Sequence, residues 1–199
     1  MAKVFTLWLG VQKGRGRGKM KRQKLKIQNI VATTSLGKRI PLVKFAGSQT
    51  NSEYNPEQFP GLVLRIKKTK YDVRVFSSVN LVCTGTKSVG QVREVVNQVV
   101  KKLTKVKIKI DKKPKINVQN IVASGSVGMV LDLNKLTIQL ENTEYEPEQF
   151  PGLVYKLPEI NATFLLFSNG KLVCTGTKNR DQLENAMTKL LKNLRSLKM

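Results

Sequence analysis

Apolar and polar residues alternate along several short stretches of the chain, and this period of two predicts β-strands. The expected strands cover residues 26–36, 62–66, 71–77 and 81–86, and the last three are close enough in sequence to form an antiparallel meander. Residues 107–112 alternate in the same way and predict a further strand. Prolines and a glycine interrupt the pattern at residues 56–61, which indicates a loop. The pattern is typical of a sheet of short strands.

Two stretches change from the strand period to a helical one. A short helix is expected to begin near Pro41, because proline suits the first turn of a helix. Ser88 is a candidate N-cap for a longer helix. The apolar positions of that helix follow at steps of three and four, and they are Val89, Val92, Val96, Val99 and Leu103. We expect this stripe to pack on the sheet, although a coiled coil has similar spacing.

The chain contains an internal repeat, visible as three blocks that return 91 positions later with 22 of 24 residues identical. The blocks are QNIVA at 28–32 and 119–123, EYNPEQFPGLV at 53–63 with EYEPEQFPGLV at 144–154, and NLVCTGTK at 80–87 with KLVCTGTK at 171–178. The constant offset excludes separate motifs that share only turn chemistry. The second copy also repeats the helical stripe, as Leu183, Met187, Leu190, Leu194 and Leu197.

The joint between the copies, residues 107–122, has no Gly/Ser-rich spacer and passes from one alternating run to the next through Pro114. Flexible linkers have a different composition. We therefore predict an α+β fold in which two tandem pseudo-symmetric repeats, residues 27–112 and 113–199, share one antiparallel sheet and form a single compact body. Residues 1–26 form a basic N-terminal extension that is expected to be flexible.

The face of the sheet away from the helices should be mainly polar, yet the sequence leaves apolar side chains on it. If Phe164 and Leu166 face the helices, Leu165 and Phe167 point the other way. The same alternation places further residues on the open face, namely Val82, Thr84, Asn29, Val31 and Thr33. An apolar surface mixed with polar and basic side chains indicates a binding surface. Cover by a sheet of another protein, or burial of the strands on both faces, is the alternative.

Charge narrows the kind of ligand that this surface could bind. The chain has 36 Lys and Arg against 13 Asp and Glu, a net charge of +23, which calls for a polyanion. The segments carry +9 over residues 1–26, +11 over 27–112 and +3 over 113–199, so the charge per residue falls along the chain. The charge by itself does not specify which polyanion.

The reactive residue types are few. Histidine, the commonest metal ligand, is absent. The two cysteines, Cys83 and Cys174, are too few for a structural zinc site or a disulfide scaffold. We therefore expect both cysteines to be buried as small apolar residues, and we expect no cofactor. No apolar run approaches the ~20 residues of a membrane-spanning helix. The short apolar stretch at residues 4–11 is not followed by a cleavage site. A protein of the cytoplasm or the nucleus is expected.

From Lys26 to Met199 the chain resembles the TATA-box-binding protein family, and the archaeal members most. The resemblance rests on two QNIV blocks, two FPGLV tracts preceded by EYNPEQ or EYEPEQ, and two CTGTK blocks, all in order. It implies a saddle-shaped sheet with helices on its convex face. It also implies a general transcription factor, not an enzyme, that binds the minor groove of A·T-rich promoter DNA and bends it.

The resemblance also implies partners and a cellular location. The partners are double-stranded promoter DNA, transcription factor B and, through that factor, RNA polymerase. When DNA is absent, the sequence leaves a monomer and a homodimer as alternatives. An archaeal-type member is expected in the cytoplasm with the nucleoid, and a eukaryotic one in the nucleus.

Individual roles are carried over from the family by the resemblance. The residues that intercalate between bases are Phe59 and Phe76 in the first copy and Phe150 and Phe167 in the second. The minor-groove contacts are Asn29, Asn120, Thr84, Thr175, Val31, Val122, Val82, Val173 and Leu165. The phosphate contacts are Arg65, Lys156, Lys171, Lys87 and Lys178. Transcription factor B is expected to bind Glu144, Glu146 and Glu148, unless these glutamates only keep their loop soluble.

Three features depart from the family pattern. Arg74 stands where the second copy has Leu165, and it is expected to reach a phosphate. Asn80 replaces the basic residue that the second copy keeps as Lys171, so one phosphate contact is expected to be lost. The strong positive charge, where archaeal members are often acidic, predicts tighter non-specific binding and a steeper dependence on salt.

The basic extension has no counterpart in the family core. Its Lys- and Arg-rich part, residues 13–26, is expected to act as a polybasic arm that adds phosphate contacts. The alternative is that synthesis begins at Met20.

Two other classes of function compete with promoter binding. A generic basic RNA-binding or ribosome-associated protein also fits the charge, but it gives no reason for two pairs of phenylalanines. An enzyme that uses the open face as a substrate pocket is remote, because neither histidine nor an obvious pair of carboxylates is expected on that face.

Overall fold

The computed structural model describes residues 25–37, 39–66, 71–78, 80–108, 110 and 114–197. These residues form one antiparallel sheet with the strand order β2-β3-β4-β5-β1-β6-β10-β9-β8-β7. The strands are β1 (Lys26–Ser35), β2 (Ser52–Glu53), β3 (Gly61–Arg65), β4 (Asp72–Phe76), β5 (Asn80–Thr86), β6 (Ile116–Ser126), β7 (Thr143–Glu144), β8 (Leu153–Leu157), β9 (Ala162–Leu166) and β10 (Lys171–Thr177). The helices are α1 (Leu42–Gly47), α2 (Val89–Lys105), α3 (Leu133–Gln139) and α4 (Arg180–Ser196), with a 3-10 turn η2 (Pro158–Ile160).

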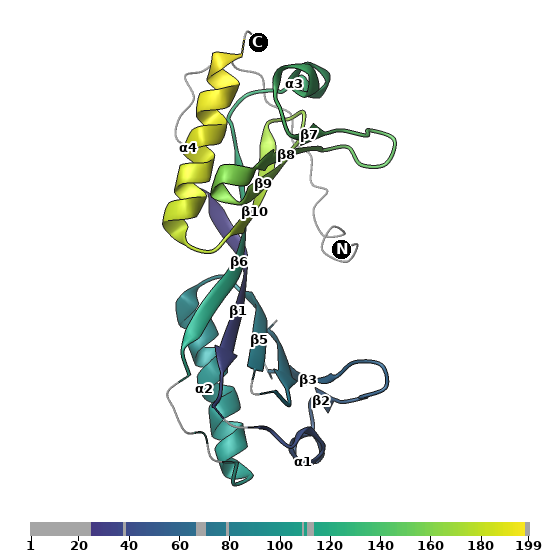
Figure 1. Cartoon of the computed structure of the whole chain (residues 1–199), viewed down its shortest axis with the longest axis vertical. Helices are drawn as coiled ribbons and strands as arrows, with labels where there is room; N and C mark the ends of the chain where they lie inside the picture. The colour runs from purple at the N-terminus through teal and green to yellow at the C-terminus, as the bar shows by residue number, and fades with distance from the viewer. Residues whose placement is uncertain are drawn as a thin grey trace.

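The two repeats meet at the long central strands β1 and β6. These strands pair antiparallel, with Asn29 opposite Val122 and Val31 opposite Asn120, so the pseudo-two-fold axis passes between them. Figure 1 shows both strands crossing from one repeat to the other. The prediction that both repeats share one continuous sheet is therefore confirmed.

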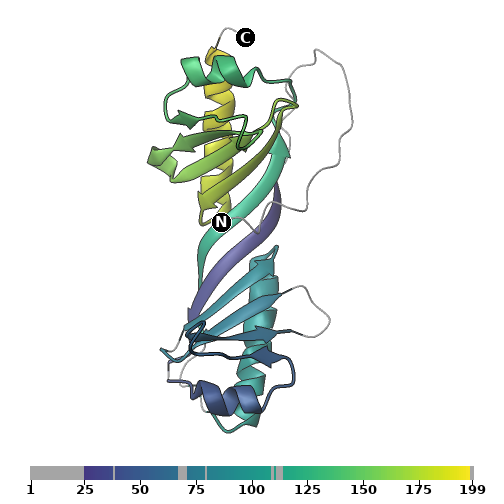
Figure 2. The same ribbon diagram turned by 90° about the vertical axis from the view of Figure 1, so that its right-hand side faces the viewer.

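The helices cover one side of the sheet and leave the other side open. The long helices α2 and α4 lie on the left in Figure 1, while the loops from β2 to β3 and from β7 to β8 project on the right. Figure 2 looks onto this second side, and there the strands lie in front of the long helices. The two repeats thus form a saddle whose convex side carries the helices, which confirms the predicted fold class.

The core lies between the sheet and the long helices. Ser88 caps α2 as predicted, since its side chain accepts a hydrogen bond from the Gln91 backbone N–H. The prediction that Val89 belongs to the buried stripe is wrong, because this first helical residue is 45% exposed at the end of the sheet. Val95, which was not part of the predicted stripe, is fully buried. In α4 the buried residues are Leu183, Ala186, Met187, Leu190 and Leu194.

The strand expected over residues 107–112 does not form in the part of that stretch that is described. The Ile108 N–H donates to the Leu103 carbonyl and Lys107 has a φ of 61°, so the chain closes the end of α2 there. Ile108 and Ile110 pack against the core from this connection. Their alternation with lysine therefore arises from a connecting segment whose isoleucines pack on the core, and not from a strand.

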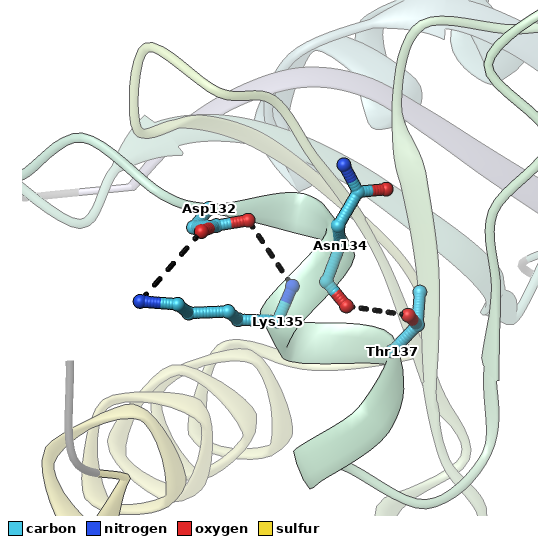
Figure 3. Close-up of polar contacts among 4 residues, drawn as sticks. All are labelled: Asp132, Asn134, Lys135 and Thr137. Carbon is cyan, nitrogen blue, oxygen red and sulfur yellow. Dashed lines mark hydrogen bonds and ion pairs between the residues drawn. The ribbon is translucent and has the colours of Figure 1, made fainter.

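The short helices sit at the two ends of the saddle and begin differently. Pro41 lies at the N-cap of α1 and not inside its first turn, and the cap has no side-chain hydrogen bond. In α3 the Asp132 carboxylate accepts from the Lys135 backbone N–H at 3.1 Å and lies 3.9 Å from the Lys135 ammonium, as Figure 3 shows. The Thr137 hydroxyl donates to the Asn134 carbonyl in the same turn. The side-chain cap thus distinguishes α3 from its counterpart.

Two further predictions concern residue types and the extension. Cys83 and Cys174 are fully buried and unbonded, and burial raises the pKa of their thiols to about 11 and about 12. The predicted polybasic arm lies outside the described residues, apart from Leu25 and Lys26. Leu25 packs on the core beside Gly125 and Lys26 begins β1. No helix in the described ranges is long and apolar enough to cross a membrane.

Candidate nucleic-acid interface

The open side of the sheet carries the side chains that strand alternation predicts for it. On β9 Phe164 and Leu166 are fully buried, and Leu165 between them is half-buried on the other face. On β5 the buried Leu81 and Cys83 alternate with the half-buried Val82 and Thr84. Half-buried residues therefore line the open face from one end of the saddle to the other.

Two asparagines lie at the centre of this face, one on each side of the pseudo-two-fold axis. The Asn29 Oδ1 accepts from the Gly85 backbone N–H at 2.7 Å, and its Nδ2 donates to the Thr84 Oγ1 at 3.1 Å. An amide nitrogen carries two hydrogens, so the second N–H of Asn29 can donate to a ligand. The bonds to Gly85 and Thr84 fix the amide before any ligand arrives.

The second repeat reproduces this arrangement. The Asn120 Oδ1 accepts from the Gly176 N–H at 2.8 Å, and its Nδ2 donates to the Thr175 Oγ1 at 3.0 Å. Gly176 has a φ of 97°, and a Cβ there would lie 2.4 Å from the Asn161 carbonyl oxygen, so the position requires glycine. Gly85 has a similar φ of 90°. Sequence reasoning missed both glycines as supports, although the repeated CTGTK tract contains them.

Apolar side chains form the floor on both sides of the asparagines. The predicted floor residues Val31, Val82, Val122, Val173 and Leu165 are all half-buried. Val63 and Val154, which sequence reasoning did not name, lie among them, because Val63 pairs with Arg74 and Val154 pairs with Leu165. Their recurrence in the FPGLV tracts was the available signal.

The four predicted intercalating residues form two pairs, one in each repeat. The ring centroids of Phe59 and Phe76 lie 5.6 Å apart, and those of Phe150 and Phe167 lie 5.9 Å apart, both edge to face. All four rings are half-buried.

A glycine lies beneath each pair. A Cβ on Gly61 would lie 2.7 Å from Phe59 and 2.9 Å from Phe76, and one on Gly152 would lie 2.6 Å from Phe150 and 3.0 Å from Phe167. The absent side chains at these two glycines make room for the rings.

Arg74 breaks the symmetry of the floor. Its backbone lies on β4, opposite Val63 on one side and Val82 on the other. Its guanidinium carbon lies 5.2 Å from the centroid of the Phe59 ring, a cation–π contact. The second repeat has Leu165 here, between Val154 and Val173.

Basic side chains frame the face. Arg65 on β3 and Lys156 on β8 are exposed at equivalent positions, and Lys87 and Lys178 are exposed just after β5 and β10. Lys171 is half-buried at the start of β10. These cations lie around the apolar floor in both repeats.

The three predicted partner-binding glutamates are all exposed, and they lie at the end of β7, which Glu144 closes, and in the loop that follows it. Glu146 and Glu148 lie in the turn, where the Glu146 carbonyl accepts from the backbone of Phe150. Glu144 forms an ion pair with Lys156. One predicted partner residue and one predicted phosphate contact therefore neutralise each other in the free protein.

These features define a class of protein. It is a tandem α+β repeat protein with a single sheet, and the uncovered face of that sheet carries amide donors, an apolar floor and paired aromatic rings in each repeat. The chain belongs to the family described as transcription factor TFIID, or TATA-binding protein, whose model matches residues 24–106 and 115–197. The family is one of transcription factors.

Individual relatives agree with this membership. The chain is 47% identical over 180 residues to the TATA-box-binding protein of Archaeoglobus fulgidus, with 89% of this chain and 98% of that protein covered. It is 48% identical to the TATA-box-binding protein of Methanosphaera stadtmanae, with 79% and 86% covered. Its fold matches the solved structure of Methanococcus jannaschii TBP with a TM-score of 0.84 at 38% identity, over 87% of this chain and 99% of that one.

Proposed function

We propose that this protein is a general transcription initiation factor whose open face binds the minor groove of A·T-rich promoter DNA and bends it. The observation that carries the proposal is the two-fold arrangement of one asparagine, one apolar floor and one phenylalanine pair in each repeat. A duplex presents its acceptors with approximate two-fold symmetry, so a two-fold face can contact both halves of a site. Family membership supports the same ligand.

The asparagines and threonines select A·T pairs. In the minor groove an A·T pair offers only the acceptors adenine N3 and thymine O2, while guanine adds an amino group in the middle of the pair. Asn29 and Asn120 each hold one N–H that can donate to such an acceptor, next to Thr84 and Thr175. The valines beside them leave no partner for a guanine amino group, so a G·C pair is disfavoured.

The phenylalanine pairs bend the duplex. We infer that Phe59 with Phe76, and Phe150 with Phe167, enter the base steps at the two ends of the site. Opening a step costs a few kcal/mol of stacking, and the bent duplex offsets this cost by burying its widened groove on the saddle. The edge-to-face packing of each pair holds the rings ready for entry.

The basic rim supplies affinity without reading sequence. Arg65, Lys156, Lys171, Lys87 and Lys178 are the phosphate contacts in this proposal. The net charge of +23 predicts that affinity falls steeply with salt, because each neutralised phosphate releases counterions. Replacing Arg65 by alanine is expected to lower the slope of log K against log salt by about one.

The projecting loop of the second repeat is the proposed docking site of a protein partner. Glu144, Glu146 and Glu148 there suit a basic surface on transcription factor B, which then brings RNA polymerase to the promoter. Without DNA, a second copy of the chain could cover the same apolar face, and a dimer is expected. The chromosome as ligand implies a nucleoid location in an archaeal-type cell.

The proposal is tested by two measurements on labelled duplexes. A duplex with eight central A·T pairs and its G·C-substituted version are titrated with the protein, and the end-to-end distance of each bound duplex is measured by energy transfer. We expect at least a hundredfold preference for A·T together with a bend, since each unfavourable pair costs about 1–3 kcal/mol. Equal affinities without a bend refute the proposal, and a preference for single-stranded RNA in the same titration favours a generic RNA-binding protein.

A further inference from the structure

The two halves of the open face are nearly identical, which makes their differences informative. The equivalent floor positions carry the same residue in both repeats, as the pairs Asn29 and Asn120, Val31 and Val122, Val63 and Val154, Val82 and Val173, and Thr84 and Thr175. In the middle of this floor Arg74 replaces an apolar residue, Leu165 in the second repeat. Asp72 on the same face of β4, where the second repeat has Thr163, is a further difference. A face identical in both halves would bind an asymmetric duplex equally well in either direction, so such differences can set a direction.

The position of Arg74 points toward bases. β4 has β3 on one side and β5 on the other, and Arg74 pairs with the two floor valines Val63 and Val82. Arg65, by contrast, lies on β3 beside the edge strand β2. Phosphates run along the outside of a groove and base edges along its floor. A side chain that starts among floor residues is therefore placed over base edges.

The contact between Arg74 and the Phe59 ring indicates which part of the DNA site Arg74 lies over. The Arg74 guanidinium carbon lies 5.2 Å from the centre of that ring, and both residues line a hollow of about 170 Å³ with Gly61 and Val63. Phe59 belongs to the pair proposed to open the terminal base step. The guanidinium is thus held next to that step, at one end of the site only.

Arginine and leucine differ in the base pairs that they tolerate. A guanidinium carries five donors and no acceptor, so it can bond to the acceptors N3 and O2 of an A·T pair, but it repels the guanine amino group, which is itself a donor. Leucine leaves that amino group without a partner but adds no such repulsion. Selection against G·C is therefore stronger beneath Arg74 than beneath Leu165.

We propose that Arg74 is a specificity-determining residue that makes the two halves of the DNA site unequal. The half beneath Arg74 selects A·T next to the opened step, and the half beneath Leu165 tolerates a G·C pair there better. Arg74 thereby sets the direction in which the saddle lies on an asymmetric site. This inference rests on the proposed function, because it assumes that the open face binds the minor groove.

The test measures direction. A duplex with one G·C pair at one end of an A·T octamer is compared with the all-A·T octamer. A DNA-cleaving chelate is attached to a cysteine introduced by Gln149→Cys, in the exposed turn of the second repeat. The native cysteines, Cys83 and Cys174, are fully buried and do not compete for the reagent. Cleavage then marks the end of the duplex beneath the second repeat.

The wild-type background is expected to cleave the end with the G·C pair about ten times more than the other end, relative to the all-A·T duplex. Arg74→Leu is expected to bring this ratio near one. The double change Arg74→Leu with Leu165→Arg is expected to reverse it. Each substitution installs a residue that the other repeat already holds at that position, and thermal unfolding of each variant checks the fold.

Two results overturn the inference alone. One is a wild type that prefers and bends A·T DNA while Arg74→Leu leaves the direction unchanged. The other is an Arg74→Leu variant that loses affinity equally for both duplexes with a salt slope lower by about one, which identifies a phosphate contact. A wild type that neither prefers nor bends A·T DNA overturns the proposed function, and this inference with it.

Discussion

Gly152→Ala is the smallest change that reaches the proposed wedge of the second repeat. The new Cβ would lie 2.6 Å from Phe150 Cε1 and 3.0 Å from Phe167 Cε1. Ordinary contact between such carbons begins near ~3.5 Å, so the Phe150 ring must move by roughly 1 Å and the pair loses its fit. An edge-to-face pair is worth about 0.5–1.5 kcal/mol, which sets the scale of the effect.

The substitution is expected to act on the rings and not on the backbone. Gly152 lies directly before β8, and its φ is not in the left-handed region, so alanine fits the chain there. We expect a loss of A·T-octamer affinity of up to about tenfold, which corresponds to about 1.4 kcal/mol, and a smaller bend. Fluorescence titration gives the affinity and energy transfer gives the bend. The unfolding temperature is expected to fall by only a few degrees, because the ring pair is worth about 0.5–1.5 kcal/mol.

Gly47→Ala is the matched control, because no atom lies within 4 Å of a Cβ built at Gly47 at the end of α1. It is expected to leave affinity and bend unchanged. The reasoning is refuted if Gly152→Ala binds and bends DNA as the wild type does, or if both glycine variants lose affinity to the same extent.

Three further predictions address the core, the centre of the face and the cysteines. Phe167→Ala is expected to lower DNA bending with only a small loss of unfolding free energy. Phe164→Ala empties a fully buried site and should lower the unfolding free energy by about 3–5 kcal/mol in chemical denaturation. Equal losses of unfolding free energy in the two variants would place Phe167 in the core. Asn120→Ala leaves the Gly176 N–H without its acceptor, so we expect the unfolding free energy to fall by about 1–2 kcal/mol. We also expect a weaker preference for A·T DNA, and an unchanged preference would contradict a minor-groove contact by Asn120. The raised thiol pKa values of Cys83 and Cys174 mean that burial favours the neutral form. Their contribution to the unfolding free energy should therefore be constant below pH 9 and fall as the pH rises through about 11 and 12. A variant with alanine at both positions should show a smaller fall over this pH range, and an equal fall would contradict this cause.

The parts of this structure that follow from local pattern could be predicted from the sequence. The alternation on β5 and β9 placed Val82, Thr84, Leu165 and Phe167 on the open face, because side chains on a strand alternate whatever the fold. The constant offset between the copies indicated the tandem repeat, and the composition of the joint at residues 107–122 indicated one continuous sheet. Ser88 marked the start of α2 because its capping bond is local.

The features that escaped prediction depend on contacts between distant segments. Val89 has the right spacing, but its burial depends on where the sheet ends. Residues 107–110 alternate like a strand, yet no neighbouring strand is available to pair with their described part. The two-residue strands β2 and β7 exist only through pairing with β3 and β8.

The side-chain interactions of the site show the same limit. The ion pair of Lys156 with Glu144, and the stacking of Arg74 on Phe59, join segments whose register the sequence does not specify. Gly61 and Gly152 could be recognised as loop glycines, but the rings that they accommodate became visible only in three dimensions. The supporting role of Gly85 and Gly176 likewise needed the position of the asparagines.

The groove that the open face binds can be tested with inosine. An inosine–cytosine pair lacks the guanine amino group, so its minor groove resembles that of A·T while its major groove resembles that of G·C. If the floor around Asn29 and Asn120 reads the minor groove, a duplex with inosine–cytosine in place of all eight A·T pairs should bind within about threefold of the A·T octamer and bend as it does. An affinity for the inosine duplex as low as that for the G·C duplex would contradict minor-groove binding.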